Sequence, residues 1–184
     1  MILMKTKKIE IEIPEGKKAE WINGVLTLVD ESNNRPVTER IKTFEDARRE
    51  LGSAHPLVEE YETITCRCDG LSTDILAYMK LRIICAALNE GWKPQFTKDE
   101  RRYFPCFILY TQEEIDDMDE DEKSRVVYRS GNNASAGVTF AGVNNGASYA
   151  YANIGSRLTF KSRELALYAG KQFIELYADL NFRI

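Results

Sequence analysis

The sequence predicts an α+β fold, and three observations lead to that prediction. Short segments near the N-terminus and in the second half are rich in β-branched and aromatic residues, which is typical of strands. Two longer segments, about 72–90 and 162–180, repeat apolar residues three and four positions apart, which predicts two main helices that each bury one face. The chain has 184 residues, of which 43% are hydrophobic, so it is long enough to enclose a core.

The N-terminal part is predicted to form an antiparallel β-meander. Lys7–Pro14 alternates isoleucine with charged residues, which is the pattern of a half-buried strand. Further on, Asn23 and Gly24 tolerate the positive φ angles of a tight hairpin turn, so Trp21 should lie opposite Leu26. The three strands together would present one apolar face.

Residues 30–40 are typical of a linker, because they are polar and include Pro36. We therefore expect a small N-terminal appendage over residues 1–30. The main α+β domain would then cover residues 41–184, with the remaining short strands in its C-terminal part.

The helices of the main domain are predicted from their capping residues. Thr43 with Asp46 three residues later begins a short helix. The first long helix begins at Ser72 or Thr73, and its apolar stripe is wide enough to indicate burial against a sheet. Ser162 caps the last helix, which we expect to be continuous.

The segment Tyr103–Tyr110 is almost wholly apolar and aromatic, which predicts a strand that is buried on both faces or lies at an interface. Pro105 cannot donate a backbone hydrogen bond, so it indicates an edge strand or a bulge. Thr111 and Glu114 then have the spacing of a capping box, which begins an acidic helix.

The segment Gly131–Asn153 carries no charge and consists mainly of small and amide side chains with a few rings. Such a surface is poor material for acid–base catalysis and suits adaptable contact with a partner. We therefore predict that it presents the contact surface of a non-enzymatic binding or structural protein. The candidate binding residues are Phe140, Asn144, Asn145, Tyr149 and Tyr151.

A tight turn is expected inside this neutral segment, because Asn145 and Gly146 are a second hairpin signal. A two-residue turn there would place Phe140 opposite Tyr151. The competing interpretation is a glycine-rich hairpin whose rings pack internally and contact nothing else.

Catalytic and metal-binding constellations are not evident. His55 is the only histidine, and it lies in a loop between two predicted helices. Cys66 and Cys68 are spaced too tightly for a zinc knuckle, and the acidic run 113–122 lacks the glycine of a calcium-binding loop. We expect no catalytic residue, no metal and no cofactor, although an enzyme whose site is assembled only by the fold stays an alternative.

The second alternative is a single-stranded nucleic-acid accessory protein. Arg101 and Arg102 next to Tyr103 mix positive charge with an aromatic ring, as single-strand binders do. A charged turn before a core strand has the same appearance, and the net charge of −4 argues against a dedicated duplex-DNA binder.

Three stretches carry a resemblance to a group of uncharacterised proteins of phages and prophages in gut anaerobic bacteria: IEIPEGKKAEWINGVLTLV, LRIICAALNEGWKP and GSRLTFKSRELALYAGKQFIELYADL. The resemblance covers nearly the whole chain. It implies a phage or mobile-element setting, and it carries over no activity and no site residue. We expect the partner to be a protein or a phage assembly component, and we expect no membrane contact. The first residues are too few and too charged for a signal peptide, so we expect a cytoplasmic protein, with virion association as the alternative.

Overall fold

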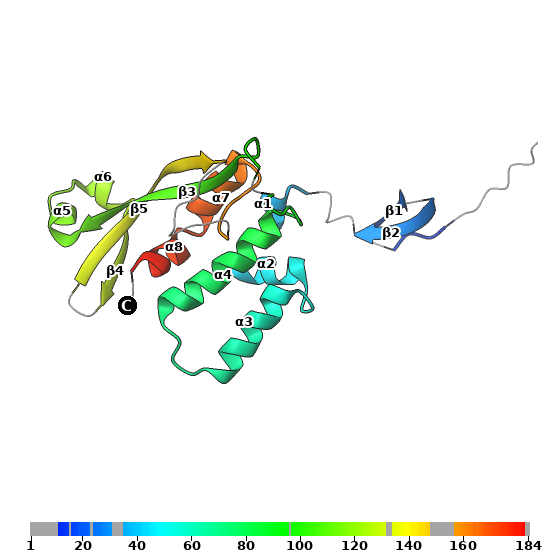
Figure 1. Cartoon of the computed structure of the whole chain (residues 1–184), viewed down its shortest axis with the longest axis horizontal. Coiled ribbons are helices and arrows are strands. Elements are labelled where there is room, and N and C mark those ends of the chain that lie inside the picture. The colour runs from blue at the N-terminus through cyan, green and yellow to red at the C-terminus, as the bar shows by residue number, and fades with distance from the viewer. Residues whose placement is uncertain are drawn as a thin grey trace, which may run out of the picture. The chain divides into compact units, whose positions relative to one another are not determined.

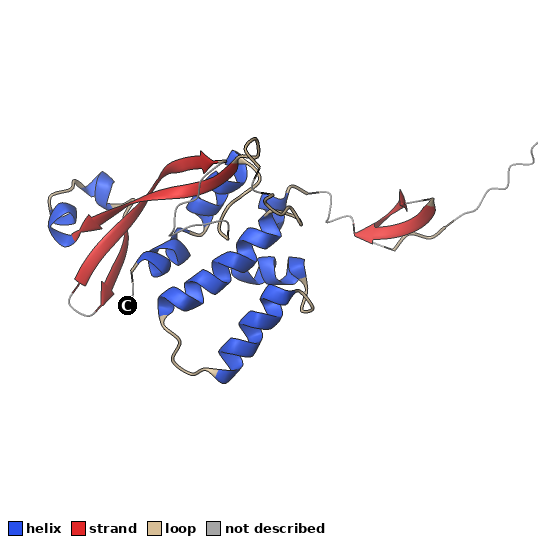
Figure 2. Cartoon of the chain, viewed as in Figure 1, coloured by secondary structure: helices blue, strands red, loops and turns tan. Residues whose placement is uncertain are grey.

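A computed structural model shows how the chain folds, and it has both helices and antiparallel sheets (Figures 1 and 2), so the predicted α+β class is confirmed. The residues it describes are 11–14, 16–22, 24–30, 35–95, 97–131, 134–147 and 157–182. The chain divides into two compact units, Met1–Arg40 and Ile41–Ile184.

The first unit contains a two-stranded antiparallel hairpin and one short helix: β1 (Lys17–Ile22), β2 (Val25–Asp30) and α1 (Val37–Arg40). Trp21 pairs with Leu26, so the predicted hairpin is confirmed. Gly24 has a φ of 81°, a value that an L side chain rarely adopts and that glycine tolerates.

The predicted third strand of the meander is absent from the part of it that the structure describes. Residues 7–10 lie outside the described residues, and Ile11–Pro14 belong to no strand. The backbone N–H of Lys17 donates to the carbonyl of Pro14, so a turn does form there. For residues 11–14 the prediction of a strand was wrong. Alternation shows that one face of a segment can be buried in a sheet, but it does not choose the strand with which the segment pairs.

The second unit begins with three helices: α2 (Phe44–Leu51), α3 (Pro56–Arg67) and α4 (Thr73–Leu88). The capping box before α2 is confirmed, because Thr43 and Asp46 exchange side-chain and backbone hydrogen bonds of 3.1 and 3.0 Å. His55 caps α3, with its Nδ1 accepting from the backbone N–H of Leu57 at 3.2 Å. The histidine therefore has a structural role at a helix start.

A three-stranded antiparallel sheet follows in the order β3-β5-β4, with β3 (Arg102–Thr111), β4 (Val127–Gly131) and β5 (Ala134–Gly146). Two short helices connect β3 to β4, namely α5 (Gln112–Asp116) and α6 (Glu120–Lys123). The capping box of Thr111 and Glu114 is confirmed. A second capping box at Asp119 begins α6, so the predicted acidic helix consists of two pieces.

The tight turn predicted at Asn145 and Gly146 is wrong. Both residues lie inside β5, where they pair with Tyr103 and Arg102. The β4–β5 connection lies between Gly131 and Ala134 instead. The local preference of Asn145 and Gly146 for a turn is outweighed here, because β5 forms a long ladder of hydrogen bonds with β3, a strand far away in the sequence.

The last segment forms two helices where the sequence predicts one: α7 (Arg163–Gln172) and α8 (Ile174–Asn181). Phe173 separates them with φ −114° and ψ 28°, and its side chain is buried. Ser162 caps α7 as predicted, by accepting from the N–H of Leu165 at 3.3 Å. Burial of Phe173 is a tertiary contact that helical periodicity does not reveal.

Helix α4 packs against α2 and α3 and also against α8, while α7 and α8 contact the sheet (Figure 1). Gly170 allows α7 to approach closely, because a Cβ at this position would overlap the Phe140 ring and lie 2.7 Å from the Cβ of Pro105. The core therefore lies between α4, the α7–α8 pair and the inner face of the sheet.

Candidate functional site

One edge of strand β3 carries no strand among the residues that the structure describes, and we call it the free edge. It pairs with β5 on one side, and on the other side the described residues add only an isolated bridge between Tyr103 and Phe160, with hydrogen bonds of 3.0 and 2.8 Å. Both backbone groups of Tyr103 therefore point away from β5. Since strand residues alternate, Pro105, Phe107 and Leu109 also point their backbone groups to this edge. Pro105 thus occupies the edge position that its missing N–H indicates.

The bridge is anchored to the end of α4. The buried side chain of Asn89 donates to the carbonyl of Thr159 at 2.8 Å and accepts from the N–H of Lys161 at 3.0 Å. The Cys85 thiol donates to the same Thr159 carbonyl at 3.1 Å. Burial raises the pKa of Cys85 to about 12, so its sulfur is a neutral thiol and not a nucleophile.

A groove of about 480 Å³ runs along the free edge beyond this bridge. None of the described residues that line it is charged, although 29% of the residues of the whole chain are charged. Asn144 and Asn181 supply polar groups. Its apolar lining consists of Phe104, Pro105, Cys106, Phe107, Leu109, Leu158, Tyr177 and Leu180.

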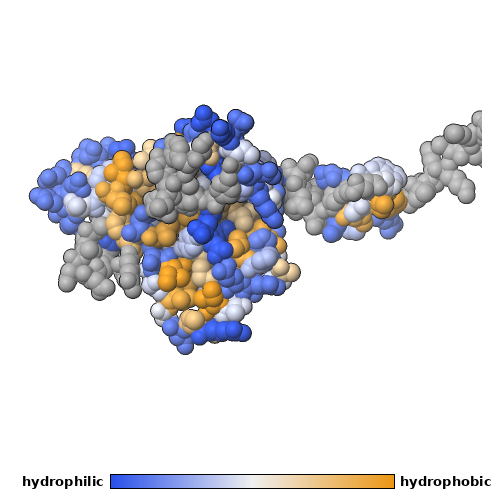
Figure 3. Space-filling view, viewed as in Figure 1, coloured by the Kyte–Doolittle hydropathy of each residue, from blue (hydrophilic) through white to orange (hydrophobic). Residues whose placement is uncertain are grey.

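Aromatic packing supports the groove. The Phe107 ring lies 4.7 Å from the Tyr177 ring and 5.9 Å from the Phe140 ring, between centroids. Tyr177 is buried, and burial raises the pKa of its hydroxyl well above the usual value of 10. Next to these rings, Ile108 and Leu109 are 47% and 49% exposed on opposite faces of β3. Figure 3 shows apolar surface over the sheet beside α5 and α6.

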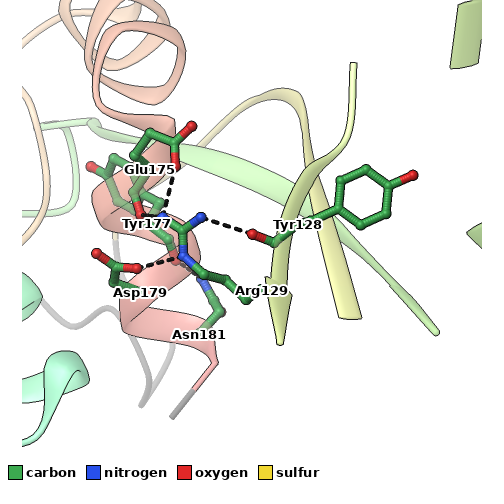
Figure 4. A network of polar contacts seen from close by, with 6 residues as sticks. All are labelled: Tyr128, Arg129, Glu175, Tyr177, Asp179 and Asn181. Carbon is green, nitrogen blue, oxygen red and sulfur yellow. Dashed lines mark hydrogen bonds and ion pairs between the residues drawn. The ribbon is translucent and has the colours of Figure 1, made fainter. Parts of the chain in front are cut away.

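Arg129 of β4 holds α8, which carries one wall of the groove. Its guanidinium donates to Asp179 at 2.5 Å, and to the carboxylate and backbone carbonyl of Glu175 at 2.7 and 2.9 Å. Figure 4 shows this guanidinium pointing at α8, while the Tyr128 ring points away. Burial works against the charge of Arg129, but the two carboxylates outweigh it and raise its pKa. Because these ion pairs hold α8, they also fix the position of Tyr177 on that helix.

A second pocket, of about 420 Å³, lies near Phe140. Its lining mixes charges, because Arg125 and Lys171 lie beside Glu122. The Lys171 ammonium is 5.9 Å from the centroid of the Phe140 ring. This pocket shows no arrangement of acid, base and nucleophile among the described residues.

The structure separates the residues predicted to form the contact surface. Phe140 faces α7, while Asn144 is exposed and lines the groove beside β3. Asn145 is half-buried and accepts from Arg101 at 2.6 Å. Tyr149 and Tyr151 lie outside the described residues.

The residues predicted for nucleic-acid contact do not form an exposed cluster. Arg102 is buried and donates to the carbonyl of Ala147. Arg101 is exposed. Tyr103 is half-buried, and its backbone pairs with that of Phe160.

Other kinds of site are not found in the part of the chain that the structure describes. No group of three or more His, Cys, Asp or Glu side chains there could hold a metal ion. No helix there is both long enough and apolar enough to cross a membrane.

Sequence reasoning missed the free edge of β3 as the site, although the apolar run Tyr103–Tyr110 was the signal that could have found it. That run was compatible with a core strand or an interface, and Pro105 indicated an edge or a bulge; the strand order shows that β3 lies at an edge. No family model, no curated protein and no solved structure matches this chain.

Proposed function

We propose that this is a non-enzymatic binding or structural protein whose second unit takes up an extended segment of a partner along the free edge of β3. The observation that carries the proposal is the combination of a strand edge that no described strand covers with a groove beside it whose described lining is uncharged. In strand addition, backbone hydrogen bonds supply affinity and pockets for alternate side chains supply specificity.

The edge supplies both parts of such a site. Phe107 and Leu109 offer backbone N–H and C=O groups, while Pro105 offers only its carbonyl. The groove would receive every second side chain of the added strand. An uncharged lining selects apolar or aromatic side chains there, because a charge placed in it would lose hydration without gaining a partner.

This proposal moves the contact surface from the neutral segment 131–153 to β3. Strand β5 lies behind the edge and contributes Asn144 to the groove. The phage or mobile-element setting implied by the resemblance stays part of the proposal, with a phage protein as the partner. The geometry does not favour nucleic-acid binding over strand addition, because Arg102, one of the three residues predicted for nucleic-acid contact, is buried.

A selection from a displayed library of random peptides tests the proposal. Leu109→Pro removes an N–H that points to the free edge and leaves the ladder with β5 intact, whereas Leu109→Ala keeps that N–H. We expect apolar peptides to be enriched on the wild-type chain and on Leu109→Ala, and to be lost on Leu109→Pro. Equal enrichment on Leu109→Pro, or no enrichment over an empty support, would contradict the proposal.

A further inference from the structure

The pocket near Phe140 is lined by two positive charges, and it is separate from the groove beside β3. We infer that this pocket binds a small organic monoanion, namely a carboxylate carried on an apolar or aromatic body. The described linings of the pocket and of the groove have no residue in common, so the inference does not depend on the proposed function.

The pocket forms where the ladder between β4 and β5 ends. The last pair of this ladder is Val127 with Val138, and the N–H of Val126 donates to the carbonyl of Lys123 at 3.1 Å, so the chain turns away from β5 there. Strand β5 continues past this point, and the pocket of about 420 Å³ lies beside it. The other walls come from the segment between α5 and β4 and from the junction of α7 with α8. The volume lies within the usual range of small-molecule sites.

The two cations of the pocket lack an acidic partner. Arg125 and Lys171 are both exposed, and neither forms an ion pair with a described residue. The Nε of Arg125 donates to the Asp121 carbonyl at 3.0 Å, which leaves the two terminal nitrogens without an acceptor among the described residues. The Lys171 ammonium lies 5.9 Å from the centroid of the Phe140 ring, which attracts a cation but does not neutralise it. Both cations can therefore donate to a bound anion.

The balance of charge selects a single negative charge. Glu122 is the acidic side chain of the described lining, and its carboxylate accepts from the N–H of Asp119 at 3.2 Å at the start of α6. Two positive charges and one negative charge leave one positive charge, which a monoanion matches. A guanidinium suits a carboxylate, because its parallel N–H groups can meet both oxygens. A doubly charged phosphate would lose part of this attraction to repulsion from Glu122.

The remaining lining favours a ligand with an apolar body. Met118, Phe140 and Ile174 contribute apolar surface beside the charges, and all three are half-buried. A ring or a short alkyl chain placed against them would release water from this surface, whereas an inorganic anion would leave it wet. The pocket therefore fits a ligand with a charged end and an apolar end.

Phenylacetate is the probe for this site, because it carries one carboxylate on an aromatic ring. It is titrated into the full-length chain while the assigned NMR signals of the backbone amides are followed. We expect saturable shifts at Phe140 and at the α7–α8 junction, with a dissociation constant of about 1 mM for so small a ligand. Phenylacetamide has nearly the same shape without the charge and should bind about tenfold more weakly. The absence of saturable shifts at these amides, or equal affinity for the amide, would overturn the inference.

A matched pair of lysine variants tests where the anion binds. Lys171→Met removes a cation of the pocket, whereas Lys80→Met removes one that lies 5.5 Å from the centroid of the Phe44 ring and outside the described lining. Lys171→Met and Arg125→Met should each raise the dissociation constant for phenylacetate by about fivefold or more. Lys80→Met should leave it unchanged. Equal effects of the two lysine variants would show general attraction by surface charge and would overturn the site.

Glu122→Gln should change the affinity in the opposite direction. Glutamine keeps an acceptor for the N–H of Asp119 and removes the negative charge, so phenylacetate should bind about twofold more tightly. Weaker binding to this variant would contradict the balance of charge on which the inference rests. Leu109→Pro, which alters the free edge of β3, should bind phenylacetate as the wild type does. The anion site and the proposed strand addition can therefore fail independently of each other.

Discussion

Strands β3 and β5 both have an edge that lacks a described strand partner, and the two edges differ in how they are protected. Beyond Val138, no described residue pairs with β5 on the β4 side. There it carries a bulge at Ala141, next to Gly142 with its φ of 152°, and the N–H of Asn145 is taken by the side chain of Asn144 at 2.8 Å. Such features discourage an added strand.

The β3 edge has less protection. Its strand is regular, because the extra residue of the bulge belongs to β5. Pro105 removes one donor, and the bridge to Phe160 covers one end. The outward backbone groups of Phe107 and Leu109 lie beside an uncharged groove. A neutral composition alone therefore does not make a binding edge, because backbone regularity and an adjacent groove are also required.

The largest expected effect separates the two sides of β3. Ile108→Pro removes an N–H that points toward β5, so it should lower the free energy of unfolding by about 3 kcal/mol. Leu109→Pro removes an N–H that points to the free edge and should cost less than about 1 kcal/mol. Urea unfolding of both variants measures the difference. Equal losses would show that the outward direction assigned to Leu109 is wrong.

The next effect concerns the wall of the groove. Arg129→Met removes the ion pairs to Glu175 and Asp179, and we expect it to cost about 2 kcal/mol because these hydrogen bonds are charge-assisted and partly buried. Peptide capture at the β3 edge should weaken as well, since α8 loses its anchor. Arg125→Met is the matched control, because Arg125 is exposed and its Nε donates only to the Asp121 carbonyl. A loss no larger than that of the control would remove the anchoring role.

A smaller effect tests the bulge on β5. Gly142→Ala places a side chain at a φ of 152°, where the surrounding space is open and the backbone is the obstacle. We expect a cost of about 1.5 kcal/mol from backbone strain. Peptide capture by β3 should not change, and Ala141→Ser provides a control at the exposed neighbour. A variant that unfolds normally but captures peptides less well would mean that the two edges are coupled.

The smallest effect concerns the anchor of the Phe160 bridge. The Cys85 thiol has a pKa of about 12 in the folded chain, against 9.0 for its ordinary value. Its contribution to stability is complete below pH 9 and is lost as the pH rises toward 12, because the unfolded chain releases the proton first. By pH 10 the resulting loss in the free energy of unfolding amounts to about 1 kcal/mol. Cys85→Ala should flatten that part of the pH profile, and an unchanged slope would contradict the assignment.

Thiol labelling gives an independent check on the same residue. Cys66 and Cys68 are exposed and should react with a disulfide reagent at once. Cys85 is buried and should react only when the chain unfolds. Fast labelling of Cys85 would show that the bridge region opens under native conditions.

Features that depend on a few neighbouring residues could be predicted from the sequence. The capping boxes at Thr43 and Thr111, the hairpin that pairs Trp21 with Leu26, and the cap at Ser162 all follow from groups within four residues or across one turn. Their physical basis is local hydrogen bonding and turn geometry, which need no distant partner.

Tertiary structure decided the rest. The pairing of Asn145 with Tyr103, the break at Phe173 and the absence of a strand over residues 11–14 depend on contacts between segments far apart in the chain. The same holds for the candidate site. The apolar character of Tyr103–Tyr110 is visible in the sequence, and Pro105 indicates an edge or a bulge. The strand order decided that β3 lies at an edge, and α8, Leu158 and Asn144 complete the groove beside it. Periodicity states which face of an element is apolar, and the competition between distant partners decides what covers that face.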